Sequence, residues 1–411
     1  MNTPSGILKK IELTNVGPTN NAKALFAPGL NIITGDNGLG KTFLMDCAWY
    51  ALTDTWAGNI ALPKYASESK RAIVAYTIGS TQSHNDINGE ITFNKTNSEW
   101  LRKPQNGIMK GAAVYSLVDN SYALWDSAEK CYAPGAEAHI VSDKQVWNGS
   151  ESFPDGLISD WLTWQKNQDI YPFEVFKTIL KAVSPPEMGK LYPGEPMSAP
   201  DGKILPTIVF PYATVPVVYA SAGIKRVITL AYLIVKAWIQ HKALSAEENT
   251  NMVVIIDEIE AHIHPKWQRT ILGALIEIQK NLAPKANVQF IISTHSPLIL
   301  ASAEAVFDSD RDKLFRVRLS DSKTDAIIQE EDFIKYGQIN AWLTSPVFDL
   351  AQARSVEAEK AIEYAKHLQL EDSPKPEEIR KAHEMLIRYL SQTDPFWPRW
   401  IYFAEQNGVE V

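Results

Sequence analysis

The clearest pattern along the chain is a set of short apolar segments separated by loops and amphipathic segments. Residues 7–14 alternate apolar and polar positions and predict a strand, and residues 29–34 form a short apolar strand before a glycine-rich loop. Helical spacing follows directly at 42–53. The runs 252–256 and 288–293 are rich in β-branched residues, which indicates strands buried on both faces. Together these segments predict an α/β sheet.

The pattern between and after these segments predicts two additions to the sheet. Residues from about 55 to 215 interrupt it and predict an insertion with strands at 72–78, 89–93 and 112–118, helices within 155–183 and a Pro- and Gly-rich loop at 185–202. We expect short strands at 208–212 and 215–221 and helices at 224–241, 267–280, 353–368 and 376–391. The expected organisation is therefore one domain, 1–345, with that insertion, followed by a helical region, 346–411.

Composition narrows the class of protein. The 411 residues are 45% hydrophobic and 21% charged, as in ordinary globular proteins, and the net charge of -8 gives no general attraction to nucleic acid or to acidic membranes. Only two cysteines occur, Cys47 and Cys131, so no disulfide framework is expected. The N-terminus lacks the apolar region of a signal peptide, and the longest apolar run, 227–239, is interrupted by Lys236 and too short to span a bilayer. We expect a cytoplasmic protein with no membrane partner.

The strongest chemical motif is the glycine-rich loop GDNGLGKT at 35–42. It matches the P-loop pattern and stands between a predicted strand and helix, the context that this pattern requires. Glycines let backbone N–H groups converge on phosphate oxygens at a helix N-terminus. Lys41 is expected to reach the β- and γ-phosphates and Thr42 to offer its hydroxyl to Mg²⁺. The expected nucleotide-binding residues of the loop are Gly35, Asn37, Gly38, Gly40, Lys41 and Thr42.

A second motif is the acid pair Asp257 and Glu258 at the end of an apolar strand. The carboxyl end of such a strand lies at the same sheet edge as the P-loop. Asp257 is expected to hold Mg²⁺, and Glu258 to act as the general base on the attacking water. An acidic surface turn is the structural alternative, and the upstream P-loop argues against it.

Two weaker motifs complete the series. His295 follows the buried strand 288–293, where it could contact the γ-phosphate, although a lone histidine is usually structural. Ser221 and Gly223 open the helix before the acid-pair strand. They could bind phosphate there, or Ser221 could simply cap the helix.

In this order the four motifs resemble the Walker A, signature, Walker B and switch-histidine motifs of ABC-type ATPases. The Asn37 variant of the loop and the run DEIEAHIHP at 257–265 are similar to the SMC-like and OLD-like branch and unlike the transporter branch. The resemblance covers about 7–60 and 215–300. It implies an ABC ATPase head, a P-loop sheet with an antiparallel β-lobe, here with an inserted α+β segment and a C-terminal helical region. It also implies ATP and Mg²⁺ as ligands, and a signature of one subunit that caps the γ-phosphate held by another, hence a homodimer or higher homo-oligomer.

The chain departs from the family pattern in places. Ile224 stands where the signature usually has Gln or Glu, which bears on the hydrolysis rate more than on binding. Gln82 and Gln145 are the weak candidates for the Q-loop glutamine. Metal binding is an alternative for His262 and His264, whose positions in the family face the dimer partner.

Several expected features of relatives are missing. The chain has no coiled-coil heptads, and Asp308, Asp310 and Asp312 follow no apolar strand that would make them a Toprim-like acidic site; we interpret them as a polar loop. A compact ATPase without its own nuclease is similar to the ATPase of Septu anti-phage systems, which works with an HNH nuclease. This resemblance implies a separate nuclease or toxin subunit, with DNA as a further candidate partner.

Three functions stay open at this point. The first is an ATP-hydrolysing sensor that controls a partner nuclease, the second a nucleotide-gated scaffold with little turnover, and the third a DNA-repair or chromosome-maintenance ATPase. The tail DPFWPRWIYF at 394–403 carries five aromatics and must dock, either on its own helical region or on another protein.

Overall fold

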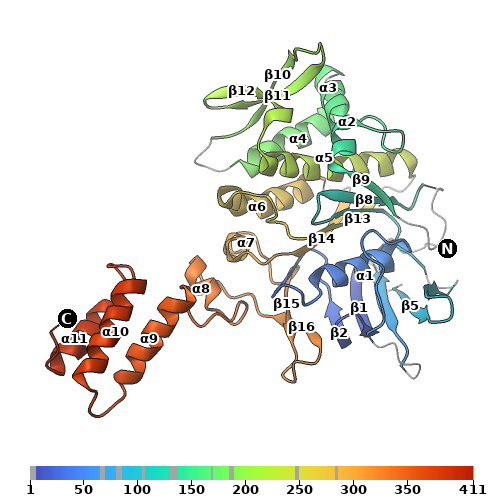
Figure 1. Ribbon diagram of the computed structural model, residues 1–411. Coiled ribbons are helices and arrows are strands. Elements are labelled where there is room, and N and C mark those ends of the chain that lie inside the picture. Colours follow the sequence, from blue (N-terminus) through green and yellow to red (C-terminus); the bar gives the residue numbers. More distant parts are fainter. Residues whose placement is uncertain are drawn as a thin grey trace. The chain divides into compact units, whose positions relative to one another are not determined.

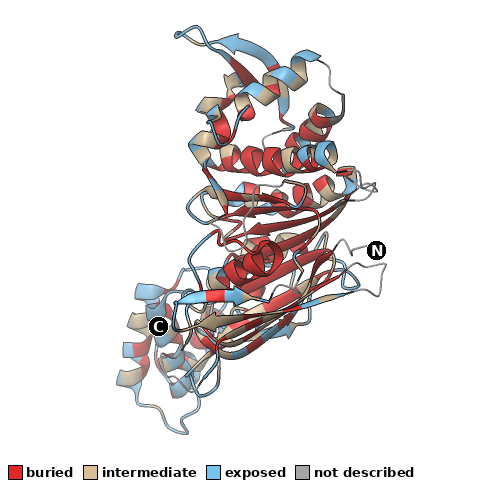
Figure 2. Cartoon of the chain, turned by 90° about the vertical axis from the view of Figure 1, so that its right-hand side faces the viewer, coloured by how far each residue is buried: buried red, intermediate tan, exposed pale blue. Residues whose placement is uncertain are grey.

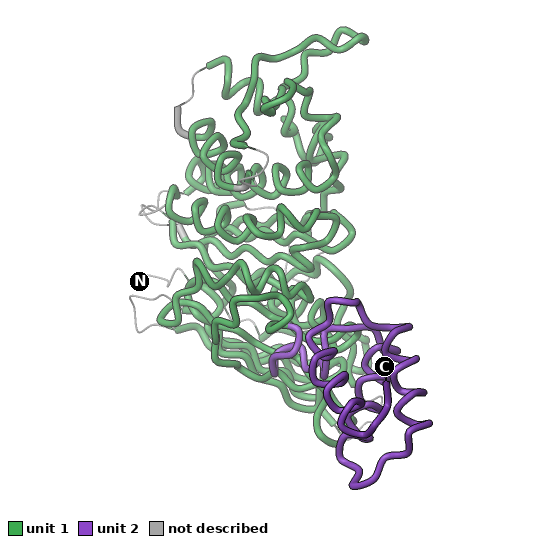
Figure 3. The backbone as a smooth tube through the Cα atoms, turned by 90° about the vertical axis from the view of Figure 1, so that its left-hand side faces the viewer, with its two compact units in different colours: residues 1–342 green, residues 343–411 purple. Residues whose placement is uncertain are grey.

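The computed structural model describes residues 6–64, 70–79, 86–103, 107–129, 138–167, 170–184, 189–245, 250–282 and 286–410. These residues form two compact units, Met1–Trp342 and Leu343–Val411, which Figure 3 colours separately. The first unit carries every predicted site residue that the structure describes.

An eight-stranded sheet is the centre of the first unit (Figure 1). Its inner strands, from β15 to β7, are all parallel, and β16, β8 and β9 flank them in antiparallel pairing. The strand order is β16 (Ala326–Glu331), β15 (Lys313–Leu319), β3 (Leu30–Gly35), β14 (Ala286–Ser293), β13 (Thr250–Ile256), β7 (Ala112–Ser116), β8 (Ser121–Asp126) and β9 (His139–Ser142). β13 and β14 are apolar on both faces because layers cover both sides of the sheet.

A five-stranded antiparallel sheet forms one covering layer. Its order is β2 (Thr19–Leu25), β1 (Ile7–Val16), β4 (Ile73–Gly79), β5 (Ile87–Asn94) and β6 (Glu99–Arg102). Helix α1 (Lys41–Thr53) is buried along nearly its whole length and shares one hydrophobic core with both sheets. The predicted α/β fold with an antiparallel β-lobe is thereby confirmed.

Helices cover the other face of the large sheet (Figures 1 and 2). Helix α5 (Ala222–Leu244) packs on β7 and β13, and α6 (Pro265–Leu282) packs on β14. The remaining elements of this unit are α2 (Asp143–Asn148), α3 (Leu157–Asn167), α4 (Ile170–Val183), α7 (Pro297–Ala303), the 3-10 turn Val217–Tyr219 and a three-stranded sheet of β10 (Tyr192–Ser198), β11 (Ile204–Phe210) and β12 (Ala213–Pro216). A short helix, α8 (Ile339–Leu343), ends at the boundary of the unit.

Some sequence-based expectations were wrong. The expected loop 185–202 contains strand β10, which pairs with β11 and bends where its register shifts between Gly194 and Met197. The expected strand 215–221 ends at Pro216 and continues as a 3-10 turn. Strands β7, β8 and β9 fall within the predicted insertion, 55–215, yet they belong to the large sheet, so the chain does not leave this sheet for the whole of that stretch.

The second unit consists of three helices, α9 (Val356–Leu368), α10 (Pro376–Tyr389) and α11 (Trp397–Gln406). Ser355 caps α9, and Pro376 opens α10 where its missing N–H costs no hydrogen bond. The aromatic tail forms α11, whose Trp400 is fully buried and donates from Nε1 to His383 Nδ1. The tail therefore docks, through Trp400, on its own unit.

Among the residues that the structure describes, no helix combines the length and the apolar character needed to cross a bilayer.

Candidate nucleotide-binding site

The predicted P-loop connects β3 to α1 and has the backbone that a phosphate loop needs. Gly35, Gly38 and Gly40 all have positive φ values, of 138°, 78° and 97°. A Cβ on Gly35 would lie 2.1 Å from the carbonyl oxygen of Val317 on β15, so only glycine fits beside that strand. The loop ends at Gly40, the N-cap of α1, so the free N–H groups of the first helical turn adjoin it.

Lys41 folds back over this loop. Its Nζ donates to the carbonyl oxygens of Gly35, at 2.8 Å, and Asp36, at 3.0 Å. Burial lowers the pKa of Lys41, while the carboxylates of Glu258 and Asp257 act in the opposite direction. The ammonium is held by neutral carbonyl oxygens, contacts that phosphate oxygens can replace with charge-assisted ones.

Thr42 and Asp257, far apart in the sequence, are in direct contact. Thr42 Oγ1 donates to Asp257 Oδ2 at 2.6 Å, and Ser293 Oγ donates to Asp257 Oδ1 at 2.5 Å. The contact arises because β13 and β14 are paired in parallel and end together beside the P-loop strand β3. A hydroxyl and a carboxylate side by side are oxygen ligands of the kind that Mg²⁺ takes together with substrate phosphates, so these residues fit the ion.

Glu258 turns the chain sharply after β13. Its φ is 47°, a left-handed conformation that a non-glycine residue adopts at an energetic cost and that is common at functional sites. Its backbone N–H donates to Ser293 Oγ at 2.7 Å, so one serine fixes both members of the acid pair. The Glu258 side chain stays 30% exposed, which leaves its carboxylate open to a water molecule.

His295 lies beside the acid pair. Its Nδ1 is 3.9 Å from Glu258 Oε1 and 3.0 Å from Glu260 Oε1, and its backbone N–H also donates to Glu260. The other oxygen of Glu260 accepts from the hydroxyl of Thr294. Glu260 is a residue that sequence reasoning missed, although a second carboxylate two positions after Glu258 was the available signal.

Arg226 was missed as well. It follows the predicted signature on α5 and is buried, and its NH2 group donates to the backbone carbonyls of Asp257 and Glu258 at 3.2 and 3.3 Å. Its NH1 group donates to Asn120 Oδ1. Burial lowers the pKa of Arg226, although the guanidinium remains charged. Helix α5 is therefore fastened directly to the acid-pair turn.

Ser221 and Gly223 lie at the start of α5. Ser221 is exposed and caps the helix, because its Oγ accepts from Ile224 N. Gly223 is buried, and a Cβ there would lie 3.1 Å from the carbonyl oxygen of His262. Among the described residues, no hydrogen bond joins either of them to the P-loop of the same chain.

The weaker candidates lie elsewhere. Gln145 is used in a capping box with Ser142 at the start of α2, and Gln82 lies outside the described residues. Within the described part of the chain no group of three or more His, Cys, Asp and Glu could hold a metal, so His262 and His264 are not part of one. Asp312 accepts from the backbone N–H groups of Leu30 and Asp308, a structural role in a turn.

Asp46 is a buried residue of α1, one helical turn after Thr42 and close enough to Asp257 for the two carboxyl groups to interact. It accepts from Tyr115 Oη at 3.1 Å. Burial, reinforced by the charge of Asp257, raises the pKa of Asp46 to about 7. The sequence contains no motif that identifies Asp46, and sequence reasoning missed it.

Two family models match parts of the chain. A model described as "AAA domain, putative AbiEii toxin, Type IV TA system" matches residues 212–301, which include the predicted signature residues Ser221 and Gly223, the acid pair and His295. A model described as "AAA domain" matches residues 10–143, which hold the P-loop.

Individual relatives are also similar. The chain is 43% identical to the Retron Vc95 probable ATPase of Vibrio cholerae serotype O1 biovar El Tor over 83 residues, 20% of this chain and only 15% of that protein. It is 22% identical to the Septu protein PtuA of Bacillus thuringiensis over 407 residues, 95% of each chain. Among solved structures, an Smc head bound to the C-winged helix domain of ScpA has 15% identity and a TM-score of 0.48, over 79% of this chain and 98% of that one.

Proposed function

We propose that the chain, which matches two AAA family models and is similar to the Septu protein PtuA, is a P-loop ATPase that binds and hydrolyses ATP as a homo-oligomeric regulator of a separate effector. The observation that carries the proposal is the hydrogen bond between Thr42 and Asp257, 215 positions apart, beside a P-loop whose glycines have positive φ. Such a junction of loop, hydroxyl and carboxylate is what a nucleoside triphosphate with Mg²⁺ requires.

Each residue of the site has a proposed role. The loop N–H groups and Lys41 bind the phosphates, and Thr42 and Asp257 hold Mg²⁺, which would supply positive charge to the phosphate oxygens. Glu258 orients and deprotonates the attacking water. His295, oriented by Glu260, donates from its ring to the γ-phosphate. These groups bind and position, which is most of what phosphoryl transfer asks of a protein.

Assembly is the second part of the proposal. Ser221 is exposed at the N-terminus of α5, and among the described residues it has no hydrogen bond to its own P-loop. Its hydroxyl and the helix N-terminus are thus free to approach the phosphates in another copy of the chain. We infer a dimer in which each signature caps the partner's nucleotide, with Mg²⁺ and ATP bound between the two.

The effector and the biological role rest on the relatives. The Septu protein PtuA and the Retron Vc95 probable ATPase are among the proteins that the chain resembles, and this favours a role in anti-phage defence with a separate nuclease or toxin subunit. The alternatives are a nucleotide-gated scaffold with little turnover, which the Ile224 departure favours, and a DNA-repair ATPase, which strong stimulation by DNA alone would indicate.

The experiment is the substitution Glu258→Gln, with Glu363→Gln on the exposed face of α9 as its matched control. Loss of a general base lowers turnover by about 10²–10⁴-fold. We expect the first variant to bind ATP, to lose hydrolysis to that extent and to accumulate as a nucleotide-bound dimer in light scattering, while the control behaves as wild type. Wild-type hydrolysis in Glu258→Gln would refute the role of Glu258. ATP binding by a wild type that shows no turnover would favour the scaffold.

A further inference from the structure

Arg226 is a charged residue inside the first unit, where arginine is rare unless other groups pair with it. It is 5% exposed and belongs to α5. Its NH2 group donates to the backbone carbonyl oxygens of Asp257 and Glu258, and its NH1 group donates to Asn120 Oδ1 in the β7–β8 turn. Because a buried charge without partners is costly, these three acceptors fix the position of the guanidinium.

The turn that Arg226 contacts has a backbone conformation that needs support. Glu258 has a φ of 47°, which costs energy in a residue that carries a side chain. Its N–H donates to Ser293 Oγ at 2.7 Å, and its carbonyl oxygen accepts from Ala261 N at 2.8 Å and from Arg226 NH2 at 3.3 Å. The N–H of Glu258 is thus held from β14 and its carbonyl oxygen from α5.

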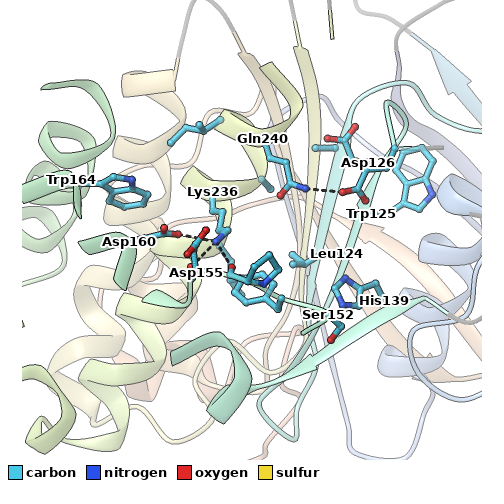
Figure 4. A pocket seen from close by; sticks show the side chains of 17 residues that line it. Leu124, Trp125, Asp126, His139, Ser152, Asp155, Asp160, Trp164, Lys236 and Gln240 are labelled. Atoms are coloured by element: carbon cyan, nitrogen blue, oxygen red, sulfur yellow. Dashed lines mark hydrogen bonds and ion pairs between the residues drawn. The ribbon is translucent and has the colours of Figure 1, made fainter. Parts of the chain in front are cut away.

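Helix α5 can support the turn because other contacts fix the helix itself. Lys236 Nζ, in its C-terminal half, donates to Asp160 Oδ2 of α3 and to the carbonyl oxygen of Asp155, both at 2.8 Å (Figure 4). Thr229 Oγ1 accepts from Trp147 Nε1 of α2 at 2.9 Å. Arg226 therefore extends from a helix that is joined by hydrogen bonds to α2 and α3.

The charge of Arg226 also suits the turn, which carries three carboxylates. Burial lowers the pKa of Arg226, and the charges of Glu260, Asp257 and Glu258 act in the opposite direction. A lysine would keep the positive charge. Its ammonium, however, presents all its donors from one atom and cannot reach both Asn120 and the two carbonyl oxygens as the planar guanidinium does. Charge and geometry can therefore be separated by experiment.

The role of Glu258 as a general base depends on where its carboxylate lies. A base must be within hydrogen-bond distance of the proton that it takes, and a displacement of about 1 Å can lower a rate about 10²-fold. We propose that Arg226 is a positioning residue for Glu258, which holds the carbonyl oxygens of the acid-pair turn so that the carboxylate is directed at the attacking water. The inference rests on the ATPase activity proposed above and assigns Arg226 no contact with the nucleotide.

The substitution Arg226→Lys tests this role, because it keeps the charge and removes the two-armed contact. We expect the kcat of ATP hydrolysis to fall about 10- to 100-fold. The Kd for ATP in calorimetry should stay unchanged, since the P-loop is untouched, and this separates positioning from a general loss of structure. Arg380→Lys, the same change at an exposed position of α10, should behave as wild type.

Two outcomes of this experiment would contradict different statements. Wild-type kcat in a folded Arg226→Lys protein would overturn the inference and leave the ATPase activity standing. A wild-type protein that binds ATP and shows no hydrolysis would overturn the proposed activity and the inference with it.

A double substitution shows whether Arg226 acts through Glu258. In a protein that already carries Glu258→Gln, the further change Arg226→Lys should not lower kcat again, because the base that Arg226 positions has been removed. A full additional loss of about 10- to 100-fold in the double variant would mean that Arg226 acts independently of Glu258, which overturns the inference.

A second variant decides the matter if Arg226→Lys does not fold. Asn120→Gly removes the acceptor of Arg226 NH1, and glycine suits the left-handed backbone of Asn120, whose φ is 64°. We expect this variant to fold and its kcat to fall about 5-fold, the effect of one hydrogen bond, at an unchanged Kd for ATP. Wild-type kcat in folded Asn120→Gly would then overturn the inference.

Discussion

The buried carboxyl of Asp46 should make the stability of the first unit depend on pH. Asp46 is 2% exposed, and its carboxyl group accepts from Tyr115 Oη. Gly58 packs so closely that a Cβ there would lie 2.4 Å from Asp46 Oδ1. Asp46→Asn replaces a group that ionises with a neutral one of the same shape. Because protonated Asp46 is also neutral, the packing should survive the change.

The magnitude follows from the pKa of Asp46, which is raised from 3.8 to about 7 by burial. The folded state holds this proton more tightly than the unfolded state. The stabilisation that protonated Asp46 gives to the folded state is therefore complete below about pH 4. This stabilisation falls as the pH rises towards 7 and is lost above pH 7. Each unit of pKa shift corresponds to about 1.4 kcal/mol, so the full span is about 4 kcal/mol. Between pH 5 and pH 8 the expected loss is about 2 to 3 kcal/mol.

The assay is urea unfolding of the nucleotide-free protein at several pH values, monitored through hydrogen exchange of the α1 amides. These amides report on the first unit. The free energy of unfolding of wild type minus that of Asp46→Asn should fall with pH by the stated amount and level off above pH 7. Asp321→Asn, an exposed carboxylate change, should show no such trend. A flat difference between wild type and Asp46→Asn would refute the argument from burial.

Two further predictions concern assembly and the tail. Lys41→Ala should lose ATP binding. A mixture of Lys41→Ala protein with Ser221→Arg protein should regain some hydrolysis, because a mixed pair contains one intact site. If hydrolysis is not regained and the specific activity is independent of protein concentration, the site works within one subunit. Trp400→Ala should destabilise the second unit by about 3 to 5 kcal/mol, as for other buried tryptophans, in thermal unfolding, while ATP binding by the first unit stays unchanged. A Trp400→Ala protein of normal stability that loses partner binding would instead indicate an interface.

Local patterns were sufficient for the elements that carry one strong period or one specific motif. The apolar runs at 252–256 and 288–293 correspond to β13 and β14, and the P-loop lies between β3 and α1 as expected. The amphipathic repeats at 353–368 and 376–391 correspond to α9 and α10. In each case the signal is contained within the segment itself, either as a period of burial or as a glycine loop.

Features that depend on distant partners could not be predicted in the same way. β10 is rich in Pro and Gly and looks like a loop, but pairing with β11 makes it a strand. β7 reads as one more strand of an insertion, and only its parallel register with β13 makes it part of the large sheet. Asp46 shows the same limit in the site, because its pKa depends on burial among segments that the sequence keeps apart.

Arg226 shows how a contact between segments distant in the sequence gives a residue a role that the sequence does not predict. In the sequence, Arg226 lies two positions after Ile224, where the chain departs from the usual signature, and no motif assigns it a role. In the structure the guanidinium is buried and holds the carbonyls of Asp257 and Glu258, the two residues proposed to bind Mg²⁺ and to activate water. A displacement of α5 would therefore displace the acid-pair turn, because the helix and the turn share these hydrogen bonds. The same helix presents Ser221 at its exposed start. The proposed signature and the acid-pair turn are therefore joined through α5, and a change in the position of this helix would act on both.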